Sequence, residues 1–201
     1  MHKLTSDLRD RLRPLYAARA GKPAIVDVPK LRFLAIDGKG DPNEPPFTES
    51  IQALFGVAFT IKFALKKQGG STQRMMPLEA LWSCEDPVAP LSEWSWTLLI
   101  AQPEEVNRTA LKAAQKELAK RGKSGGDSVR LETITEGKCV QMLHLGPYDE
   151  EWEDIETMHA FIREAGYELH GLHHEIYLND PRRCAPEKIK TILRHPVKKA
   201  K

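Results

Sequence analysis

The sequence has 201 residues, of which 41% are hydrophobic and 29% are charged, and its formal net charge is +2. This composition is ordinary for a globular protein, and so small a net charge does not indicate a nucleic-acid partner. No apolar run approaches the roughly 20 residues that a bilayer-spanning helix needs, so we expect no membrane partner.

The three cysteines, Cys84, Cys139 and Cys184, are isolated and odd in number. They lack the pattern of a disulfide framework and suit a reducing compartment. Residues 1–7 have neither the apolar core nor the cleavage site of a signal peptide. We therefore predict a cytoplasmic protein and expect a monomer, although the sequence leaves the oligomeric state open.

The first half of the chain follows an N-terminal extension, residues 1–23, in which leucines at helical spacing predict a short helix at residues 5–19. The apolar pattern then predicts four elements in the order strand, helix, strand, strand. They are a strand at residues 24–36 with a break at Pro29, a buried helix at 46–67 that ends at Gly69-Gly70, and strands at 75–83 and 94–101.

The second half repeats this order after a surface helix, which we expect to start at Gln102-Pro103 and to end near Arg121. The predicted elements are a hairpin of residues 129–135 and 138–145 across Glu136-Gly137, a helix at 149–165, a strand at 173–178 and a last strand at 189–197. We therefore predict an α+β domain at residues 24–197. Two strand–helix–strand–strand repeats, 24–101 and 129–197, would set their sheets side by side around a ligand cleft.

The predicted strand at residues 173–178 organises the candidate site. Alternation places His174, Ile176 and Leu178 on one face, which we expect to lie against a helix, and His173, Glu175 and Tyr177 on the other. A carboxylate beside a phenol on a central strand suits a wet, partly enclosed cavity. The alternative is that Glu175 is one more solvated acid, since glutamate is usually exposed.

Several common chemistries have little support in the sequence. His170, His173 and His174 have the density of metal ligands, but no cysteine pair or acidic cluster accompanies them, and His173 and His174 point to opposite faces. The glycine pairs match neither a phosphate-binding loop nor a dinucleotide motif, and no Gly-x-Ser-x-Gly is present. We therefore expect no metal and no cofactor.

What remains is a set of aromatic and acidic side chains. Proteins commonly hold flat organic ligands between aromatic walls with a few polar groups. Taken singly, each aromatic residue is better explained as part of the core. The set consists of Trp82, Trp96, Tyr148, Trp152 and Tyr177, with Glu79 and Glu175.

Four motifs in this order resemble the GyrI-like small-molecule-binding family: residues 38–43, 76–82, 144–148 and 175–183. The resemblance covers residues 24–197 and implies two strand–helix–strand–strand units in pseudo-twofold relation around a ligand cleft. Ser83-Cys84 follow Trp82 here, where many such relatives have a second aromatic residue.

The resemblance implies two functions. Some relatives sense aromatic, often cationic, compounds through a buried Glu, which Glu175 matches by its place in the motif. Stand-alone relatives are implied to be hydrolases that detoxify cyclopropanoid, DNA-alkylating natural products by opening the cyclopropane with water. This implies Glu175 and Tyr148 as catalytic residues, and a ligand-binding set of Glu79, Trp82, Trp96, His144, Trp152 and Tyr177. The alternative is binding without turnover. A third hypothesis is a protein that acts on a topoisomerase, but the sequence shows no apolar or acidic stripe on which such a partner would dock.

Overall fold

The computed structural model describes residues 7–67, 69, 74–84 and 89–200, and two compact units divide the chain. Both units combine antiparallel strands with helices, which confirms the predicted α+β class. Each unit is assembled from separate stretches of sequence. The first contains Met1–Leu12, Leu31–Met76 and Ser83–Ile134, and the second contains Arg13–Lys30, Pro77–Trp82 and Thr135–Lys201.

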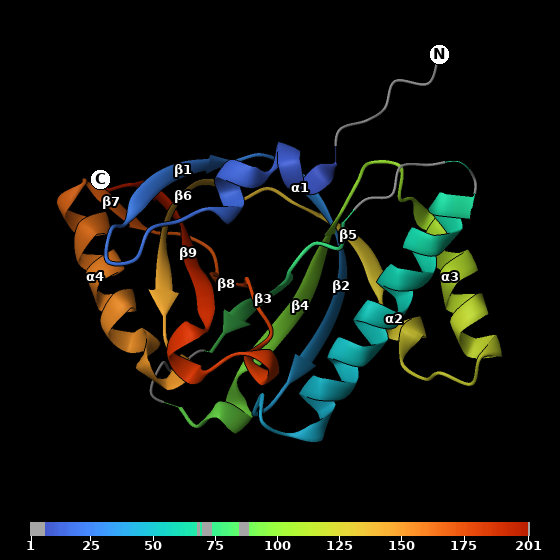
Figure 1. Ribbon diagram of the computed structural model, residues 1–201. Helices are drawn as coiled ribbons and strands as arrows, with labels where there is room; N and C mark the ends of the chain where they lie inside the picture. The colour runs from blue at the N-terminus through green and yellow to red at the C-terminus, as the bar shows by residue number, and fades with distance from the viewer. Residues whose placement is uncertain (1–6, 68, 70–73, 85–88, 201) are drawn as a thin grey trace, which may run out of the picture. The chain divides into compact units, whose positions relative to one another are not determined.

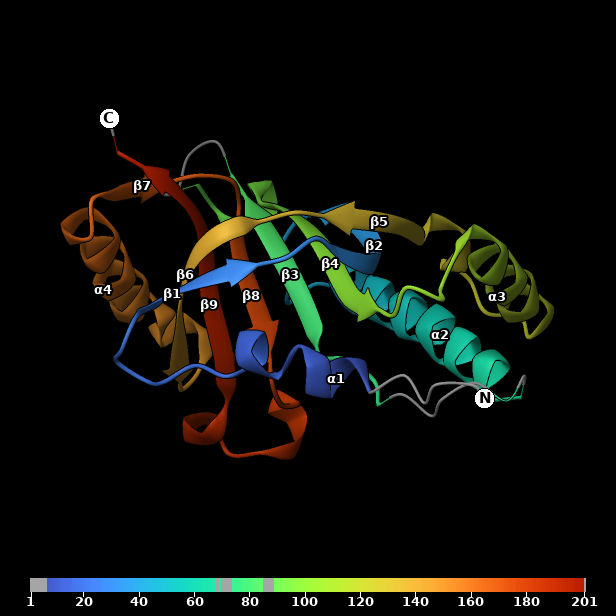
Figure 2. The same cartoon turned by 90° about the horizontal axis from the view of Figure 1, so that it is seen from above.

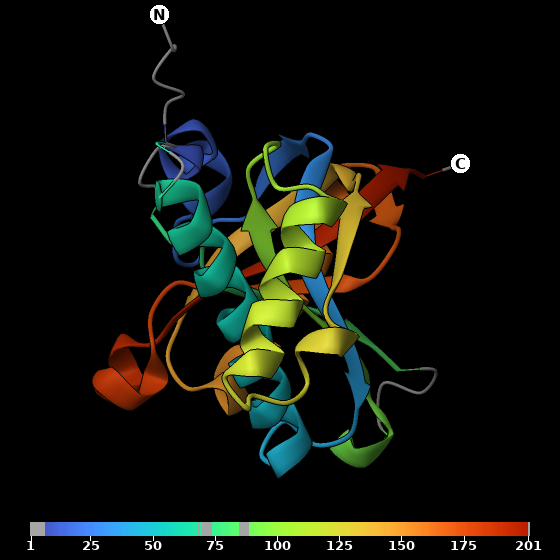
Figure 3. The ribbon, with the colours of Figure 1, turned by 90° about the vertical axis from the view of Figure 1, so that its right-hand side faces the viewer.

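The first unit is a sheet covered by two helices. Strand β2 (Leu31–Lys39) pairs with β4 (Ser95–Gln102) on one side and with β5 (Arg130–Ile134) on the other, all antiparallel. Helices α2 (Pro45–Lys67) and α3 (Arg108–Lys120) lie side by side (Figures 1 and 3). The buried side chains of α2 recur every three or four residues, which gives the helix one apolar face for the core. The short helix α1 (Leu8–Arg11) also belongs to this unit.

The second unit contains a larger antiparallel sheet. Its strands are hydrogen-bonded in the order β1 (Ala24–Val28), β6 (Gly137–Leu145), β9 (Lys190–Lys199), β8 (His173–Tyr177) and β3 (Leu78–Ser83). The short strand β7 (Tyr167–Leu169) pairs with the end of β9. The register places Glu175 of β8 opposite both Leu193 of β9 and Ala80 of β3, so these three side chains share one face.

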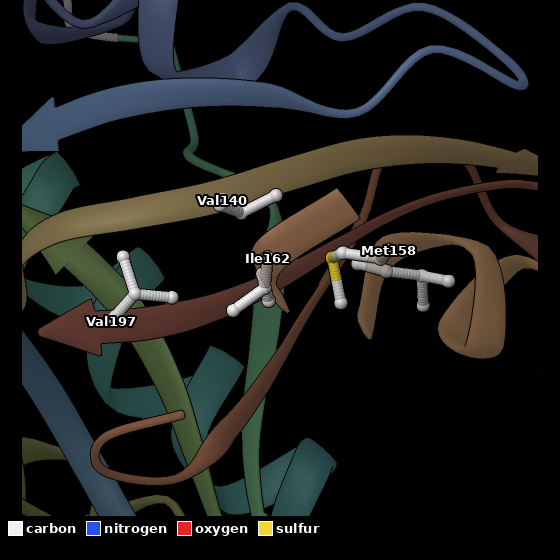
Figure 4. Packing of buried hydrophobic residues seen from close by; sticks show 5 residues of the cluster. Val140, Met158, Ile162 and Val197 are labelled. Atoms are coloured by element: carbon white, nitrogen blue, oxygen red, sulfur yellow. The ribbon is translucent and has the colours of Figure 1, made fainter. Parts of the chain in front are cut away.

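Helix α4 (Glu151–Glu164) packs on that same face, beside β6 and β9 (Figure 2). Met158 and Ile162 of the helix meet Val140 and Val197 of the sheet in a buried cluster that also includes Leu193 (Figure 4). The alternation predicted for residues 173–178 is confirmed, but the expected place of the helix is wrong. The helix lies on the face of Glu175, since Leu193, the cross-strand neighbour of Glu175, packs in one cluster with Met158 and Ile162 of α4.

Two predicted local features are wrong for identifiable reasons. The hairpin across Glu136-Gly137 does not form, since β5 pairs with β2 and β6 pairs with β1 and β9. The surface helix expected to start at Gln102-Pro103 is α3, which begins only at Arg108. The side chain of Asn107 caps it by accepting hydrogen bonds from the backbone of Thr109 and Ala110. Tertiary pairing and one capping side chain override the local pattern here.

The remaining elements are short 3₁₀ helices. They lie at Arg13–Tyr16, Leu91–Glu93, Gly126–Ser128, Tyr148–Glu150, Pro181–Arg183 and Pro186–Lys188. Residues 1–6, on which the expectation about a signal peptide rests, and Gly70, part of the predicted helix end, lie outside the described residues. The stretches predicted as contiguous repeats, 24–101 and 129–197, remain a prediction.

Candidate functional site

The carboxylate of Glu175 is held by a neighbouring phenol. The Tyr177 hydroxyl donates a hydrogen bond of 2.6 Å to Oε2 of Glu175, and the indole Nε1 of Trp82 donates one of 3.3 Å to the same hydroxyl. Strand alternation puts Glu175 and Tyr177 on one face, and the register with β3 adds Trp82 to that face. The structure therefore brings together three of the residues that the sequence predicted for the site.

Tyr148 stands at the rim of this group. It follows the corner Gly146-Pro147, and its ring forms a T-shaped pair with that of Tyr177, with centroids 5.7 Å apart. The residue is 42% exposed. Burial, with the neighbouring acids Glu151 and Glu175, raises the pKa of Tyr148 to about 12. Burial and Glu175 also raise the pKa of Tyr177 well above its ordinary value. Both phenols therefore keep their protons and act as hydrogen-bond donors at neutral pH.

A second carboxyl group in this neighbourhood was missed in the sequence. Glu151, the first residue of α4, is only 5% exposed, and within the described part of the chain its Oε1 has no hydrogen-bond partner. Burial and the nearby charge of Glu175 raise the pKa of Glu151 to about 9. Such a carboxyl stays protonated at neutral pH and can donate a proton. In the sequence, Asp149, Glu150 and Glu151 resemble the acidic residues that commonly begin a helix, so Glu151 could not be recognised as a buried carboxyl group.

His144 anchors the corner that presents Tyr148. Its Nδ1 lies 2.8 Å from the Asp154 carboxylate, and its Nε2 lies 3.1 Å from the carbonyl oxygen of Pro147. With both ring nitrogens occupied and the residue buried, His144 fixes the turn between β6 and α4. The structure thus gives it a supporting place behind Tyr148.

The other two tryptophans have different surroundings. Trp152, a predicted ligand-binding residue, is 61% exposed and lies outside the buried side of α4. Trp96 belongs to the first unit and is buried there. Its ring lies against Gly38 and forms a T-shaped pair with that of Phe47, and its Nε1 donates to the carbonyl of Gly40. The site described here consists of second-unit residues.

Glu79 lies on the opposite face of the sheet, in a buried polar network. The hydroxyl of Tyr16 donates a 2.7 Å hydrogen bond to Oε1 of Glu79, and His174 Nε2 lies 3.0 Å from Oε2. His174 Nδ1 lies 2.9 Å from Glu136, which also pairs with Arg194. The register explains this placement, since Glu79 is opposite Ile176 and not Glu175. The structure therefore does not bring Glu79 together with Glu175.

This network carries paired charges in the protein interior. Burial alone would lower the pKa of His174, but Glu136 and Glu79 outweigh it and raise that pKa to about 9. Burial alone would raise the pKa of Glu136, but His174 and Arg194 lower it to about 2. Arg194 also donates hydrogen bonds to Gln141 and to the carbonyl of Leu15. The network ties the segment that contains Leu15 and Tyr16 to the back of the strand that carries Glu175.

The family model of the GyrI-like small-molecule-binding domain matches residues 21–198. The chain belongs to this family. A search among curated proteins found no match.

Two solved structures from Listeria innocua resemble this GyrI-like protein over nearly its whole length. One, an uncharacterized conserved protein, is 36% identical with a TM-score of 0.90, and the match covers 96% of this chain and 100% of that one. The other, described as a hydrolase, is 35% identical with a TM-score of 0.86 and the same coverage. The C-terminal domain of EcmrR, 13% identical with a TM-score of 0.57 over 89% of this chain and 98% of that one, shares the fold.

In the part of the chain that the structure describes, no group of three or more His, Cys, Asp or Glu residues could hold a metal ion. None of the described helices has both the length and the apolar character needed to span a membrane.

Proposed function

We propose that this GyrI-like protein is a hydrolase that opens the cyclopropane ring of cyclopropanoid, DNA-alkylating natural products with water, as a detoxification reaction. The observation that carries the proposal is the carboxylate of Glu175, held at 2.6 Å by Tyr177 among aromatic side chains. The 35%-identical neighbour described as a hydrolase supports the reaction class.

The reaction needs a base near the attacked carbon and a proton donor near a distant oxygen. Glu175 takes a proton from water while the water oxygen bonds to the strained CH₂ carbon. The ring C–C bond breaks, and its electron pair passes through the conjugated ring to the dienone oxygen, which becomes a phenol on gaining a proton. Glu151 supplies this proton, and the proton on Glu175 then replaces it, so the site ends the cycle unchanged.

The aromatic residues have separate tasks in this proposal. Tyr177 positions Glu175, since its hydroxyl already donates to Oε2 and accepts from Trp82. Tyr148, partly exposed at the rim, hydrogen-bonds the substrate oxygen or the water. Trp82 and Trp152 would stack on a flat ligand. Trp96 remains a predicted ligand contact.

The second candidate is binding without turnover, in which the protein sequesters or senses aromatic cations. The same carboxylate favours it, because a Glu beside aromatic rings attracts a flat cation electrostatically. Incubation with a cyclopropanoid dienone in H₂¹⁸O separates the two. A hydrolase yields a product heavier by one labelled water, whereas a binding protein returns the compound intact.

A further inference from the structure

Three histidines form a cluster behind Glu175, on three different elements. The ring of His195 on β9 lies 6.0 Å from that of His173 on β8 and 5.9 Å from that of His159 on α4, centroid to centroid. Each has a buried ring nitrogen without a hydrogen-bond partner among the described residues: Nε2 of His159, Nε2 of His173 and Nδ1 of His195. Buried polar atoms normally have a hydrogen-bond partner, so three ring nitrogens without one in a single cluster need an explanation.

One member of the cluster reaches the carboxylate of the proposed site. His173 Nε2 lies 3.4 Å from Oε1 of Glu175, and the side chains are 16% and 14% exposed. Tyr177 holds the other oxygen, Oε2. Oε1 is therefore the oxygen that a cationic ligand would approach. A protonated His173 beside it would already compensate the negative charge of Glu175.

The other two histidines oppose further protonation. Burial, then His173 and His159, lower the pKa of His195 to about 4. Burial, then His173 and Arg163, lower the pKa of His159. Of the other charged groups that act on the cluster, Glu156 acts electrostatically on His159 and Glu136 on His195, and each raises the pKa of its histidine. Of the three histidines, only His173 has a carboxylate within 4 Å among the described residues, so a positive charge in the cluster is best compensated there.

We infer that His173 determines ligand charge specificity: when protonated it acts as an internal cation on Glu175 and excludes cationic ligands in favour of neutral ones. His159 and His195 confine the proton of the cluster to His173. A flat cation must then displace a proton to bind, while a neutral ligand of the same shape need not. The inference rests on the proposed site, because Glu175 has to face the ligand.

The test compares two flat probes whose own charges do not change with pH. N-methylquinolinium is a cation, and 1-methylnaphthalene is its neutral counterpart of the same shape. Fluorescence titration between pH 5 and 8 should show the affinity for the cation rising by up to about tenfold per pH unit over part of this range, as expected for the loss of one proton. The affinity for the neutral probe should stay constant.

Variants assign the effect to a residue. His173→Gln should bind the cation with an affinity that no longer depends on pH, and as tightly at pH 5 as the wild type does at pH 8. His159→Gln should move the rise to higher pH, because one repelling neighbour of His173 is gone. If His173→Gln does not fold, the pH shift in His159→Gln still tests the inference. The exposed His170 provides the control, and His170→Gln should match the wild type.

Several results would overturn the inference. They are an unchanged pH slope in His173→Gln, an equal slope for 1-methylnaphthalene, or exclusion of the cation by the wild type at pH 8. The hydrolysis proposal is judged separately by addition of labelled water. A wild type that shows the binding pattern without hydrolysis would retain the role of His173 and discard the reaction.

Discussion

The hydroxyl of Tyr177 donates its hydrogen to Oε2 of Glu175 over 2.6 Å, two residues along the same strand. Side chains at i and i+2 of a strand share a face, so β8 itself sets this geometry. The same hydroxyl accepts from Trp82 Nε1 on the neighbouring strand, which limits its rotation. The carboxylate of Glu175 is thus oriented by its own strand and by β3, as the proposed role of a positioned base would require.

Tyr177→Phe should slow ring opening about tenfold or more, because Glu175 loses the donor that fixes Oε2. The phenyl ring keeps its packing, so the melting temperature should change little. Single-turnover kinetics and thermal unfolding measure the two effects. Tyr167→Phe is the control, since Tyr167 packs against the cluster of Val140 and Met158 and not against Glu175. Equal rates in the two variants would remove the positioning role.

Glu151→Gln should abolish the alkaline limb of the pH–rate profile. In the wild type the rate should fall as pH rises through about 9, where Glu151 loses the proton it donates. Gln donates a hydrogen bond but no proton, so the variant should be slower by about 10²-fold and flat over that range. An alkaline limb that persists near pH 9 in the variant would assign the ionisation to another group.

The same substitution should make the protein more stable at neutral pH. The folded-state pKa of Glu151, about 9, lies above its ordinary value of 4.5, so its contribution to stability is complete below pH 4.5 and declines as pH rises toward 9. Gln has no such dependence, and the variant should be more stable than the wild type by about 3 kcal/mol at pH 7. Denaturant unfolding at pH 4 and pH 7 measures it, and an equal difference at both pH values would contradict it.

The network behind β8 should set a pH window for stability. The pKa of His174, raised from 6.5 to about 9, gives a contribution that is complete below pH 6.5 and is lost as pH rises through 9. The pKa of Glu136, lowered from 4.5 to about 2, gives one that is present above pH 4.5 and is lost as pH falls through 2. His174→Gln should cost about 3–5 kcal/mol, because the buried carboxylates of Glu79 and Glu136 each lose their contact with a charged imidazole.

Thermal unfolding from pH 5 to pH 10 checks this prediction. The wild type should lose stability between pH 6.5 and 9, and the variant should be flatter over that interval. His170→Gln again serves as the control, because His170 is exposed. A wild-type curve that does not decline above pH 6.5 would show that His174 does not carry the charge assigned to it.

Gly38→Ala tests the packing of Trp96 in the first unit. A Cβ at Gly38 would lie 2.0 Å from the ring of Trp96, its cross-strand partner, so the ring must move. We expect a loss of about 1–3 kcal/mol, as for other overpacked sites. Gly56→Ala is the comparison, because its Cβ would meet only the flexible side chain of Leu118, at 3.3 Å. Denaturant unfolding of both variants should rank them in this order.

The sequence predicted the elements whose patterns are long and local. Helix α2 and the alternation of β8 follow directly from the spacing of apolar residues. The pairing of β5 with β2 was not predictable, because Glu136-Gly137 resembles a hairpin turn and strand partners are chosen by tertiary contacts. Glu175, Tyr177 and Trp82 were found by alternation and motif together.

The placement of the other buried polar residues depends on contacts between residues that are distant in the sequence. Glu79 faces Tyr16 and His174 because of the β3–β8 register, which a single strand does not reveal. Glu151 looked like an ordinary acid in a first helical turn, and only its burial near Glu175 distinguishes it. The histidine cluster joins α4, β8 and β9, so no spacing along the chain marks it.

The most direct measurement is the single-turnover reaction of a cyclopropanoid dienone in H₂¹⁸O with the wild type and Glu175→Gln, followed by mass spectrometry. Gln keeps the shape of the side chain but accepts no proton near neutral pH. The account predicts one ¹⁸O-labelled water in the wild-type product and a rate about 10²-fold lower in the variant, with binding of the neutral compound unchanged. Intact compound from the wild type, or an unchanged rate in the variant, would contradict it.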